Sequence, residues 1–411
     1  MTKQLAGPTL AEFIAAQSVV AKVAQETPVE VSRYLGEILG FPVTMKCENL
    51  QRTGAYKVRG AYNRMSKLTD EERALGVVAA SAGNHAQGVA LAARELGIHA
   101  TIFMPIGVAL PKLLATRAYD ADVVLGGVIF NEALDAAKEF GKKTGAIFIP
   151  PFDNHDVIAG QGTVGLEIWD QVPDVETVIV PIGGGGLIAG VASAMKQRAA
   201  EAGRTLRVIG VQSSQAAAYP PSIAAGKPTT IDIKPTIADG IAVARPGELP
   251  FQIIKDTVDE IVTVSDDDIA RALLVLIERA KLIAEPAGAA GVAAILAGKI
   301  DTSGPTTVVV SGGNIDAKLM ERVISRGLIA SGRYLHIRIP LPDRPGQLAR
   351  VSEIVADQNA NVIEVLHTRH GVGLQISQVE LSVDIETRGP EHSEQVLTAL
   401  RDEGYEPRSD V

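Results

Sequence analysis

A lysine that follows a short apolar strand is the first residue of this sequence that could do covalent chemistry. Pro42–Met45 predicts a strand, a helical pattern begins near Lys57, and Gly54 gives the turn between them backbone freedom. We expect Arg59 to raise the positive potential beside Lys57. A lysine held in such a turn can lose its proton and act as a nucleophile or base. The alternative is an ordinary surface lysine, and three further segments bear on that choice.

Four consecutive glycines follow the strand Thr177–Ile182 and lead into a helix. The loop consists of Gly183, Gly184, Gly185, Gly186 and Leu187. Its backbone N–H groups can face an anion, and the helix N-terminus adds its dipole. Gly184, Gly186 and Ala189 also match a dinucleotide fingerprint, but the next strand ends at Ser213 without the acidic residue that holds a ribose. A monophosphate is therefore favoured over a dinucleotide or a purely structural turn.

A second loop of small residues lies between an apolar strand and a helix. It consists of Ser81, Ala82, Gly83, Asn84 and His85. Its N–H groups could hold a carboxylate, and the Asn84 amide can both donate and accept. His85 could act as a base, although a histidine in the first turn of a helix is more often a structural donor.

A third strand ends in a hydroxyl and two glycines, in the sequence Ser311-Gly312-Gly313-Asn314. Ser311 could present its Oγ to a ligand there. The alternative is an ordinary turn at the end of a strand.

Composition and charge limit the partners and the cellular compartment that this protein can have. The net charge of −9 argues against a nucleic-acid partner. The single cysteine, Cys47, rules out an intrachain disulfide framework and fits a reducing compartment. The N-terminus lacks a signal pattern, and the uncharged run Thr177–Met195 contains Pro181 and four glycines, so we expect strand, loop and helix there rather than a membrane span. We therefore expect a cytoplasmic protein without membrane contact.

Strand and helix patterns alternate in two blocks, residues 42–150 and 151–328, after a helical segment at 1–41. This order predicts an α/β protein with parallel sheets and a ligand cleft between the blocks. A short connection, Arg326–Arg333, leads to a βαββα pattern with a weak last strand at 334–411, which predicts a ferredoxin-like module. In the two blocks we predict strands at Val77–Ala80, Ala100–Met104, Asp122–Leu125, Ala146–Ile149, Val178–Ile182, Arg207–Gln212, Glu260–Val264 and Thr306–Ser311.

These motifs together resemble those of the fold-type-II pyridoxal-phosphate enzymes. Glu48–Gly60 is similar to the cofactor-lysine motif, with Ala55-Tyr56 where Ser-Phe is commoner, and the three loops match in the same order. Within that family the chain resembles the threonine ammonia-lyases (threonine dehydratases) over about residues 8–328. The sequence Asp343-Arg344-Pro345-Gly346-Gln347-Leu348 resembles the ligand loop of an ACT domain.

The resemblance implies a tryptophan-synthase-beta-like fold with two catalytic domains. The smaller, mobile domain would cover about residues 42–150, and the larger one residues 1–41 and 151–328. A C-terminal α+β ferredoxin-like ACT domain would follow at 334–411.

By resemblance, Lys57 binds pyridoxal 5'-phosphate covalently through its amine. Gly183 to Leu187 would bind the phosphate, Asn84 the 3′-oxygen of the ring, and Ser311 the ring nitrogen. A neutral serine does not enforce protonation of that nitrogen, which favours loss of a β-leaving group over transamination. The segment Glu285-Pro286-Ala287-Gly288-Ala289 is similar to the family stretch near the ring.

The implied reaction converts L-threonine to 2-oxobutanoate and ammonia, and L-serine less well. Ser81 to His85 would hold the substrate carboxylate, and Lys57 would remove the Cα proton. Serine racemases resemble this chain but carry a serine at the position of Ala82, and their metal site has acids where Gln212 and Ala218 stand. We therefore expect elimination and no bound metal.

Several alternatives to this function remain open. They are a dehydratase for serine or another 3-hydroxy amino acid, a racemase, and a non-catalytic sensor that binds pyridoxal phosphate. The ACT resemblance implies allosteric control by an amino acid, in a homo-oligomer that is a dimer or a homotetramer. Threonine deamination would suit isoleucine biosynthesis, so isoleucine or valine is the expected effector.

Overall fold

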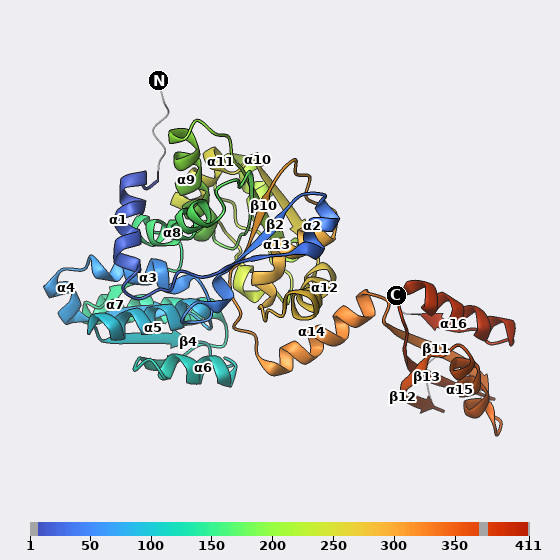
Figure 1. Cartoon of the computed structure of the whole chain (residues 1–411). Coiled ribbons are helices and arrows are strands. Elements are labelled where there is room, and N and C mark those ends of the chain that lie inside the picture. The colour runs from blue at the N-terminus through green and yellow to red at the C-terminus, as the bar shows by residue number, and fades with distance from the viewer. Residues whose placement is uncertain (1–6, 370–376, 410–411) are drawn as a thin grey trace. The chain divides into compact units, whose positions relative to one another are not determined.

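The computed structural model describes residues 7–369 and 377–409 (Figure 1). The chain divides into two compact units, Met1–Ala317 and Lys318–Val411. The first unit contains two β-sheets and the second contains one.

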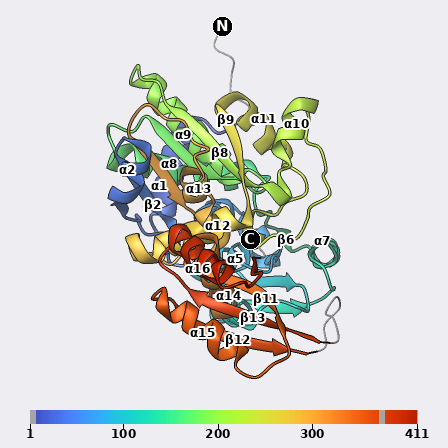
Figure 2. The same ribbon diagram turned by 90° about the vertical axis from the view of Figure 1, so that its right-hand side faces the viewer.

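The larger sheet of the first unit is parallel apart from one edge strand. In spatial order its strands are β1 (Val29–Val31), β2 (Val43–Cys47), β10 (Thr306–Val310), β7 (Thr177–Pro181), β8 (Arg207–Ser213) and β9 (Glu260–Val264). Only β1 and β2 pair antiparallel. Every residue of β7 and β10 is buried, as expected for parallel strands that are covered on both faces. Figure 2 shows β8 and β9 side by side.

The smaller sheet of the first unit is parallel throughout. In spatial order its strands are β5 (Asp122–Leu125), β4 (Ala100–Met104), β3 (Val77–Ala80) and β6 (Ile147–Phe148). The predicted strand at Pro42–Met45 forms β2 of the larger sheet, so the chain enters the smaller sheet only at β3. The domain boundaries drawn from the sequence stay a prediction.

Helices connect and cover these strands. They are α1 (Leu10–Val20), α2 (Arg33–Leu39), α3 (Lys57–Ser66), α4 (Asp70–Leu75), α5 (Asn84–Leu96), α6 (Leu110–Arg117), α7 (Phe130–Thr144), α8 (His155–Gln171), α9 (Gly186–Glu201), α10 (Tyr219–Ala225), α11 (Glu248–Thr257), α12 (Asp266–Val275) and α13 (Pro286–Leu296). Helices α8, α9 and α11 share an apolar core with β7 and β8. Helices α3 and α5 share another with β3 and β4. Helix α8 begins where the Asn154 side chain accepts hydrogen bonds from two backbone N–H groups, a normal N-cap.

Two sequence-based predictions about connecting segments were wrong. Residues 1–41 are not wholly helical, because Val29–Val31 pairs with β2 across a gap in sequence that local periodicity cannot reveal. The connection placed at Arg326–Arg333 lies largely inside helix α14 (Ala317–Ala330).

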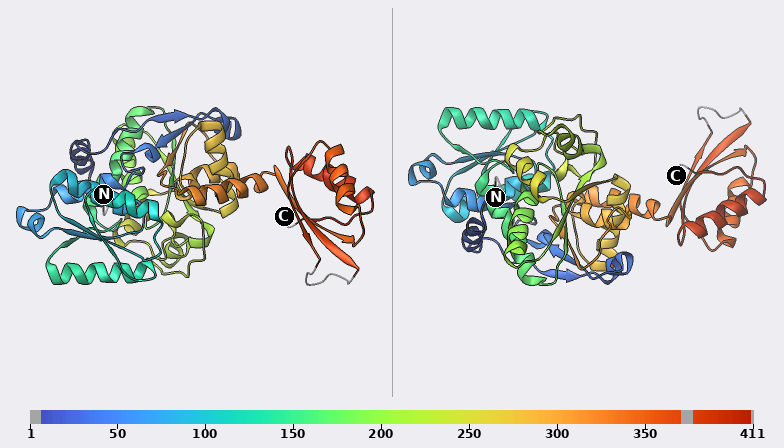
Figure 3. Two further views of the ribbon diagram at one scale, coloured as in Figure 1. Left: turned by 90° about the horizontal axis from the view of Figure 1, so that it is seen from below. Right: turned by 90° about the horizontal axis from the view of Figure 1, so that it is seen from above.

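The C-terminal unit contains an antiparallel sheet with helices on one face (Figure 3). The strands, in spatial order, are β12 (Asn361–Thr368), β13 (Gln378–Glu386), β11 (Tyr334–Pro342) and β14 (Arg408–Ser409). Buried and less buried residues alternate along β11 and β13, and the buried face packs against α15 (Gln347–Asp357) and α16 (Pro390–Asp402). The order βαββαβ agrees with the predicted ferredoxin-like module.

The uncharged run Thr177–Met195 belongs to the apolar core that α8, α9 and α11 share with β7 and β8. It forms β7, the glycine loop and the start of α9, as predicted. No helix within residues 7–369 and 377–409 is long and apolar enough to cross a membrane.

Candidate active site

Lys57 is the first residue of α3 and is half-buried. Its Nζ donates a hydrogen bond of 2.8 Å to the carbonyl oxygen of Pro151. Burial lowers the pKa of the Lys57 amine to about 8, although the nearby Glu285 carboxyl opposes the shift. At neutral pH the unprotonated fraction of this amine therefore far exceeds that of an exposed lysine. Lys57 has the surroundings of a reactive amine rather than those of an ordinary surface lysine.

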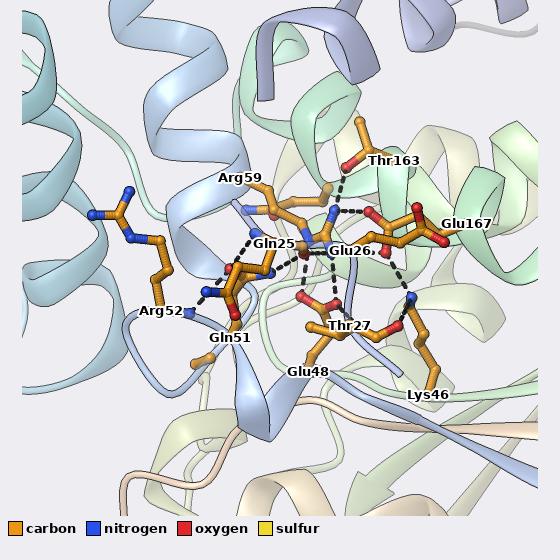
Figure 4. Close-up of polar contacts among 12 residues, drawn as sticks. Gln25, Glu26, Thr27, Lys46, Glu48, Gln51, Arg52, Arg59, Thr163 and Glu167 are labelled. Carbon is orange, nitrogen blue, oxygen red and sulfur yellow. Dashed lines mark hydrogen bonds and ion pairs between the residues drawn. The ribbon is translucent and has the colours of Figure 1, made fainter. Parts of the chain in front are cut away.

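The Arg59 guanidinium belongs to a separate, buried ion cluster (Figure 4). It donates to Glu48 at 2.8 Å through both Nε and Nη2, and to Glu167 at 2.5 Å through Nη1. Lys46 completes the cluster, with its Nζ 2.6 Å from Glu167. Two cations thus face two carboxylates. The prediction that Arg59 raises the positive potential at Lys57 was wrong, because these carboxylates neutralise its charge.

The segment that accepts the Lys57 hydrogen bond also contacts the glycine loop. Phe152 follows Pro151 and lies against two of the glycines. A Cβ added at Gly184 would be 2.4 Å from the Phe152 ring, and one at Gly186 would be 2.8 Å from Phe152 Cβ. Both distances are too short for any side chain, so glycine is required at these positions. The packing brings the glycine loop close to the segment that holds Lys57.

The glycine loop has the geometry of an anion site. Gly185 has φ +100°, and a Cβ there would lie 1.9 Å from Tyr219 Oη, which itself donates to the Gly184 carbonyl at 3.1 Å. None of the N–H groups from Gly183 to Leu187 donates a hydrogen bond to an acceptor in the described part of the chain. These free donors lie at the N-terminus of α9, which fits a phosphate group.

The dinucleotide alternative finds no support in the neighbouring strand. Gln212, near the end of β8, accepts a hydrogen bond from Tyr219 N at 3.0 Å, and Ser213 Oγ lies 3.1 Å from Thr236 Oγ1. Neither side chain is an acid.

Across the residues that the structure describes, no cluster of three or more His, Cys, Asp or Glu could hold a metal ion.

The second loop offers fewer free donors than predicted. The Gly83 N–H donates to Ser81 Oγ at 3.1 Å. The N–H groups of Ala82, Asn84 and His85 make no hydrogen bond within the described residues. They lie at the N-terminus of α5, so they can still bind a carboxylate.

His85 is a structural donor in this fold. Its Nε2 lies 2.8 Å from the Ile149 carbonyl oxygen, two residues before the Pro151 oxygen that binds Lys57. Burial and, to a smaller extent, the Lys57 charge lower the pKa of His85 to about 3. The ring is therefore neutral near pH 7, with Nε2 donating to a carbonyl that cannot donate in return. This arrangement favours the structural alternative for the side chain over the base.

Asn84 contacts the buried acid Glu285, which the resemblance had placed in the stretch near the ring without giving its side chain a partner. Asn84 Nδ2 donates to Glu285 Oε1 at 2.6 Å, and Asn314 Nδ2 donates to Asn84 Oδ1 at 2.8 Å. Burial and, second to it, repulsion from Asp239 raise the pKa of Glu285 to about 7. Glu285 is also the single acid in the otherwise uncharged stretch from Leu282 to Gly298, a signal that could have indicated its role in the site.

Ser311 follows β10 and is buried. Its carbonyl oxygen accepts a hydrogen bond from Tyr56 N at 3.3 Å, which places it beside the residue that precedes Lys57. Its Oγ makes no hydrogen bond within residues 7–369 and 377–409, so the hydroxyl is available to a ligand. The structure thus brings together Lys57, Ser311 and the Asn84 loop.

Comparison with known proteins accounts for this arrangement. Residues 20–312 match the family described as pyridoxal-phosphate dependent enzyme, and residues 336–404 match the ACT domain. An L-threonine ammonia-lyase of Thermotoga maritima is 47% identical over 401 residues, which cover 97% of this chain and 99% of that protein.

Two solved structures have a fold similar to that of this chain. The processed form of threonine deaminase isoform 2 from Solanum lycopersicum has a TM-score of 0.73 and 38% identity, covering 79% of this chain and 96% of that chain. Maize serine racemase has a TM-score of 0.73 and 35% identity, covering 79% and 98%. The predicted fold class is confirmed. The chain belongs to the family of pyridoxal-phosphate dependent enzymes and carries a C-terminal ACT domain.

Proposed function

We propose that this protein deaminates L-threonine to 2-oxobutanoate and ammonia, and acts less well on L-serine. The observation that carries the proposal is a half-buried lysine of lowered pKa, held by a segment that packs against a loop of free N–H groups. The 47% identity to an L-threonine ammonia-lyase over nearly the whole chain supports the choice of substrate.

The residues present fit pyridoxal phosphate. The N–H groups from Gly183 to Leu187 would hold the phosphate, and the Lys57 amine would hold the cofactor covalently. Asn84 would donate to the 3′-oxygen of the ring, and Ser311 would face its nitrogen with a neutral hydroxyl. When bound, the cofactor supplies an electron sink for the charge left on the substrate after its Cα proton is removed.

The rest of the site handles the substrate. Ser81 to His85 would bind the carboxylate through the N–H groups of Ala82, Asn84 and His85, while Gly83 is held by Ser81. The Lys57 amine would take the Cα proton, for which a pKa of about 8 is well matched to neutral pH. Loss of the β-hydroxyl as water, followed by hydrolysis, then gives one 2-oxobutanoate and one ammonia for each threonine.

A racemase is the second candidate, because maize serine racemase has a similar fold. At position 82, however, this chain has an alanine, which has no proton to give to the substrate. Elimination is therefore favoured. A dehydratase for serine or another 3-hydroxy amino acid would use the same residues and differ only in substrate.

The C-terminal unit would bind a regulatory amino acid. A cavity of about 240 Å³ is lined by Asp343 to Leu348, His367 and Arg369. Arg369 Nη2 lies 3.4 Å from Asp343 Oδ1, and the two side chains could exchange this contact for the carboxylate and amine of an amino acid. Leu341 and Leu381 form an apolar part of the wall. Isoleucine or valine is the proposed effector.

We also propose that the protein is a cytoplasmic homo-oligomer. In each subunit the smaller sheet and its helices would move as one domain.

A substrate panel tests the function. Purified protein with pyridoxal phosphate should form 2-oxobutanoate and ammonia in equal amounts from L-threonine, and less pyruvate from L-serine. D-Serine formed from L-serine faster than pyruvate would favour the racemase. A cofactor-loaded protein that turns over none of these amino acids would favour the sensor and contradict the proposal.

A further inference from the structure

Both ends of the Asn84 side-chain amide are held by other side chains. Nδ2 donates to Glu285 Oε1 at 2.6 Å, and Oδ1 accepts from Asn314 Nδ2 at 2.8 Å. An amide group has two N–H donors and two acceptor lone pairs. One N–H of Asn84 therefore remains after both contacts are made.

A backbone carbonyl determines which way this chain of hydrogen bonds runs. Asn314 Nδ2 also donates to the Thr53 carbonyl oxygen at 2.7 Å. Since a carbonyl can only accept, the Asn314 end that faces Thr53 must be its NH2 group. The same NH2 group faces Asn84, so the Asn84 atom there must be oxygen. Its NH2 group must then face Glu285.

Glycines make room for both residues that hold Asn84. Gly54 has φ +69°, and a Cβ there would lie 2.3 Å from Asn314 Oδ1. A Cβ on Gly312 would lie 2.3 Å from Glu285 Oε1. The Glu285 N–H also donates to the Gly312 carbonyl at 2.9 Å. Gly54 therefore leaves space for the Asn314 side chain, and Gly312 leaves space for the Glu285 side chain.

We infer that Asn314 and Glu285 are positioning residues that fix the Asn84 amide with an N–H, not an oxygen, directed to the cofactor ring oxygen. The inference rests on the proposed cofactor role of Asn84. If the Asn84 amide were reversed, its oxygen would face Glu285 Oε1 and the ring oxygen of the cofactor. All of these atoms are acceptors, so they would repel one another. The two residues act through Asn84 and need not touch the cofactor.

Titration of cofactor-free full-length protein with pyridoxal phosphate, followed by its visible absorbance, tests the inference. Asn314→Asp places acceptors against Thr53 O and Asn84 Oδ1, so it should weaken cofactor binding by about 10–100-fold. Asn131→Asp, the same change at an exposed position of α7, is the control and should bind like wild type. Asn314→Ala removes the donor without adding charge and should also weaken binding.

Conservative and apolar changes at Glu285 separate orientation from packing. Glu285→Gln keeps a carbonyl acceptor for Asn84 and should bind the cofactor within about threefold of wild type. Glu285→Leu has a similar size but no acceptor, and should lose about 10–100-fold. Thermal unfolding of each variant confirms that it folds.

Each outcome decides a stated question. Wild-type affinity in Asn314→Asp and Asn314→Ala, or equal losses in Glu285→Gln and Glu285→Leu, would overturn the inference. Wild-type protein that binds no pyridoxal phosphate would instead overturn the proposed function.

Discussion

Lys57 donates a hydrogen bond of 2.8 Å to the carbonyl oxygen of Pro151, the residue that precedes Phe152. Phe152 packs against Gly184 and Gly186. One short segment therefore contacts both the reactive amine and the anion loop. His85 adds a third contact through the Ile149 carbonyl oxygen. Residues far apart in sequence are held at one site by backbone carbonyls, which no side-chain motif reveals.

The glycine loop should not tolerate a methyl group at Gly185. Gly185→Ala would combine the strain of φ +100° with a clash against Tyr219 Oη, 1.9 Å from the added Cβ. We expect cofactor affinity to fall at least tenfold in a titration with pyridoxal phosphate. Gly226→Ala is a matched control, since Gly226 also has positive φ, +69°, but has nothing within 4 Å of an added Cβ. Equal affinities in the two variants would contradict the assignment of the anion loop.

The buried ion cluster should stabilise the first unit only while it is complete. Glu167→Gln removes one of the two carboxylates that face Arg59 and Lys46, and leaves excess positive charge in the interior. We expect the free energy of unfolding to fall by about 3–5 kcal/mol. The control, Glu95→Gln, breaks the partly exposed contact with Arg52 and should cost about 0–1 kcal/mol. Denaturant unfolding measures the loss of stability in both variants. Similar losses would mean that the buried cluster stabilises the protein no more than the partly exposed ion pair does.

The Glu285 carboxyl should make stability depend on pH. Its pKa is raised from 4.5 to about 7, so the folded state favours the protonated form. The stabilisation is fully present below about pH 4.5 and is lost as the pH rises through 7. Relative to Glu285→Gln, which cannot ionise, wild-type cofactor-free protein should lose about 1–3 kcal/mol across this interval. A constant difference in unfolding free energy from pH 4.5 to 8 would show that folding does not raise the pKa of Glu285.

Removal of the C-terminal module should separate regulation from catalysis. A cut after Ser325 would fall inside α14, so Ala330, where the helix ends, is the better last residue. The shortened protein should bind cofactor and deaminate threonine without a response to isoleucine or valine. Full-length protein that responds to no amino acid, together with a truncation that only changes its oligomeric state, would indicate a module that serves assembly alone.

Much of the fold follows from local patterns in the sequence. The strands Val77–Ala80, Ala100–Met104, Asp122–Leu125 and Glu260–Val264 begin and end where predicted, because short apolar runs are interrupted sharply by glycine or polar residues. The glycine loop was predictable for a similar reason. Its run of four glycines after a buried strand is a strong local signal.

The rest depends on contacts between distant segments. The edge strand β1 has only three residues and exists because it pairs with β2. Arg59 looks like a charge that adds to Lys57, yet Glu167 lies more than a hundred positions away in the sequence and neutralises it. Likewise, the link from Asn84 to Glu285 spans 201 positions. Local periodicity carries no information about such pairs.

The lysine to which the cofactor is attached tests the assignment of Lys57 most directly. Protein loaded with pyridoxal phosphate is reduced with borohydride and digested, and the modified peptide is identified by mass spectrometry. We expect the pyridoxyl group on Lys57, because its amine has a lowered pKa and is bound by the segment that packs against the anion loop. Modification of a different lysine, or a label spread over many lysines while Lys57 stays free, would contradict this assignment.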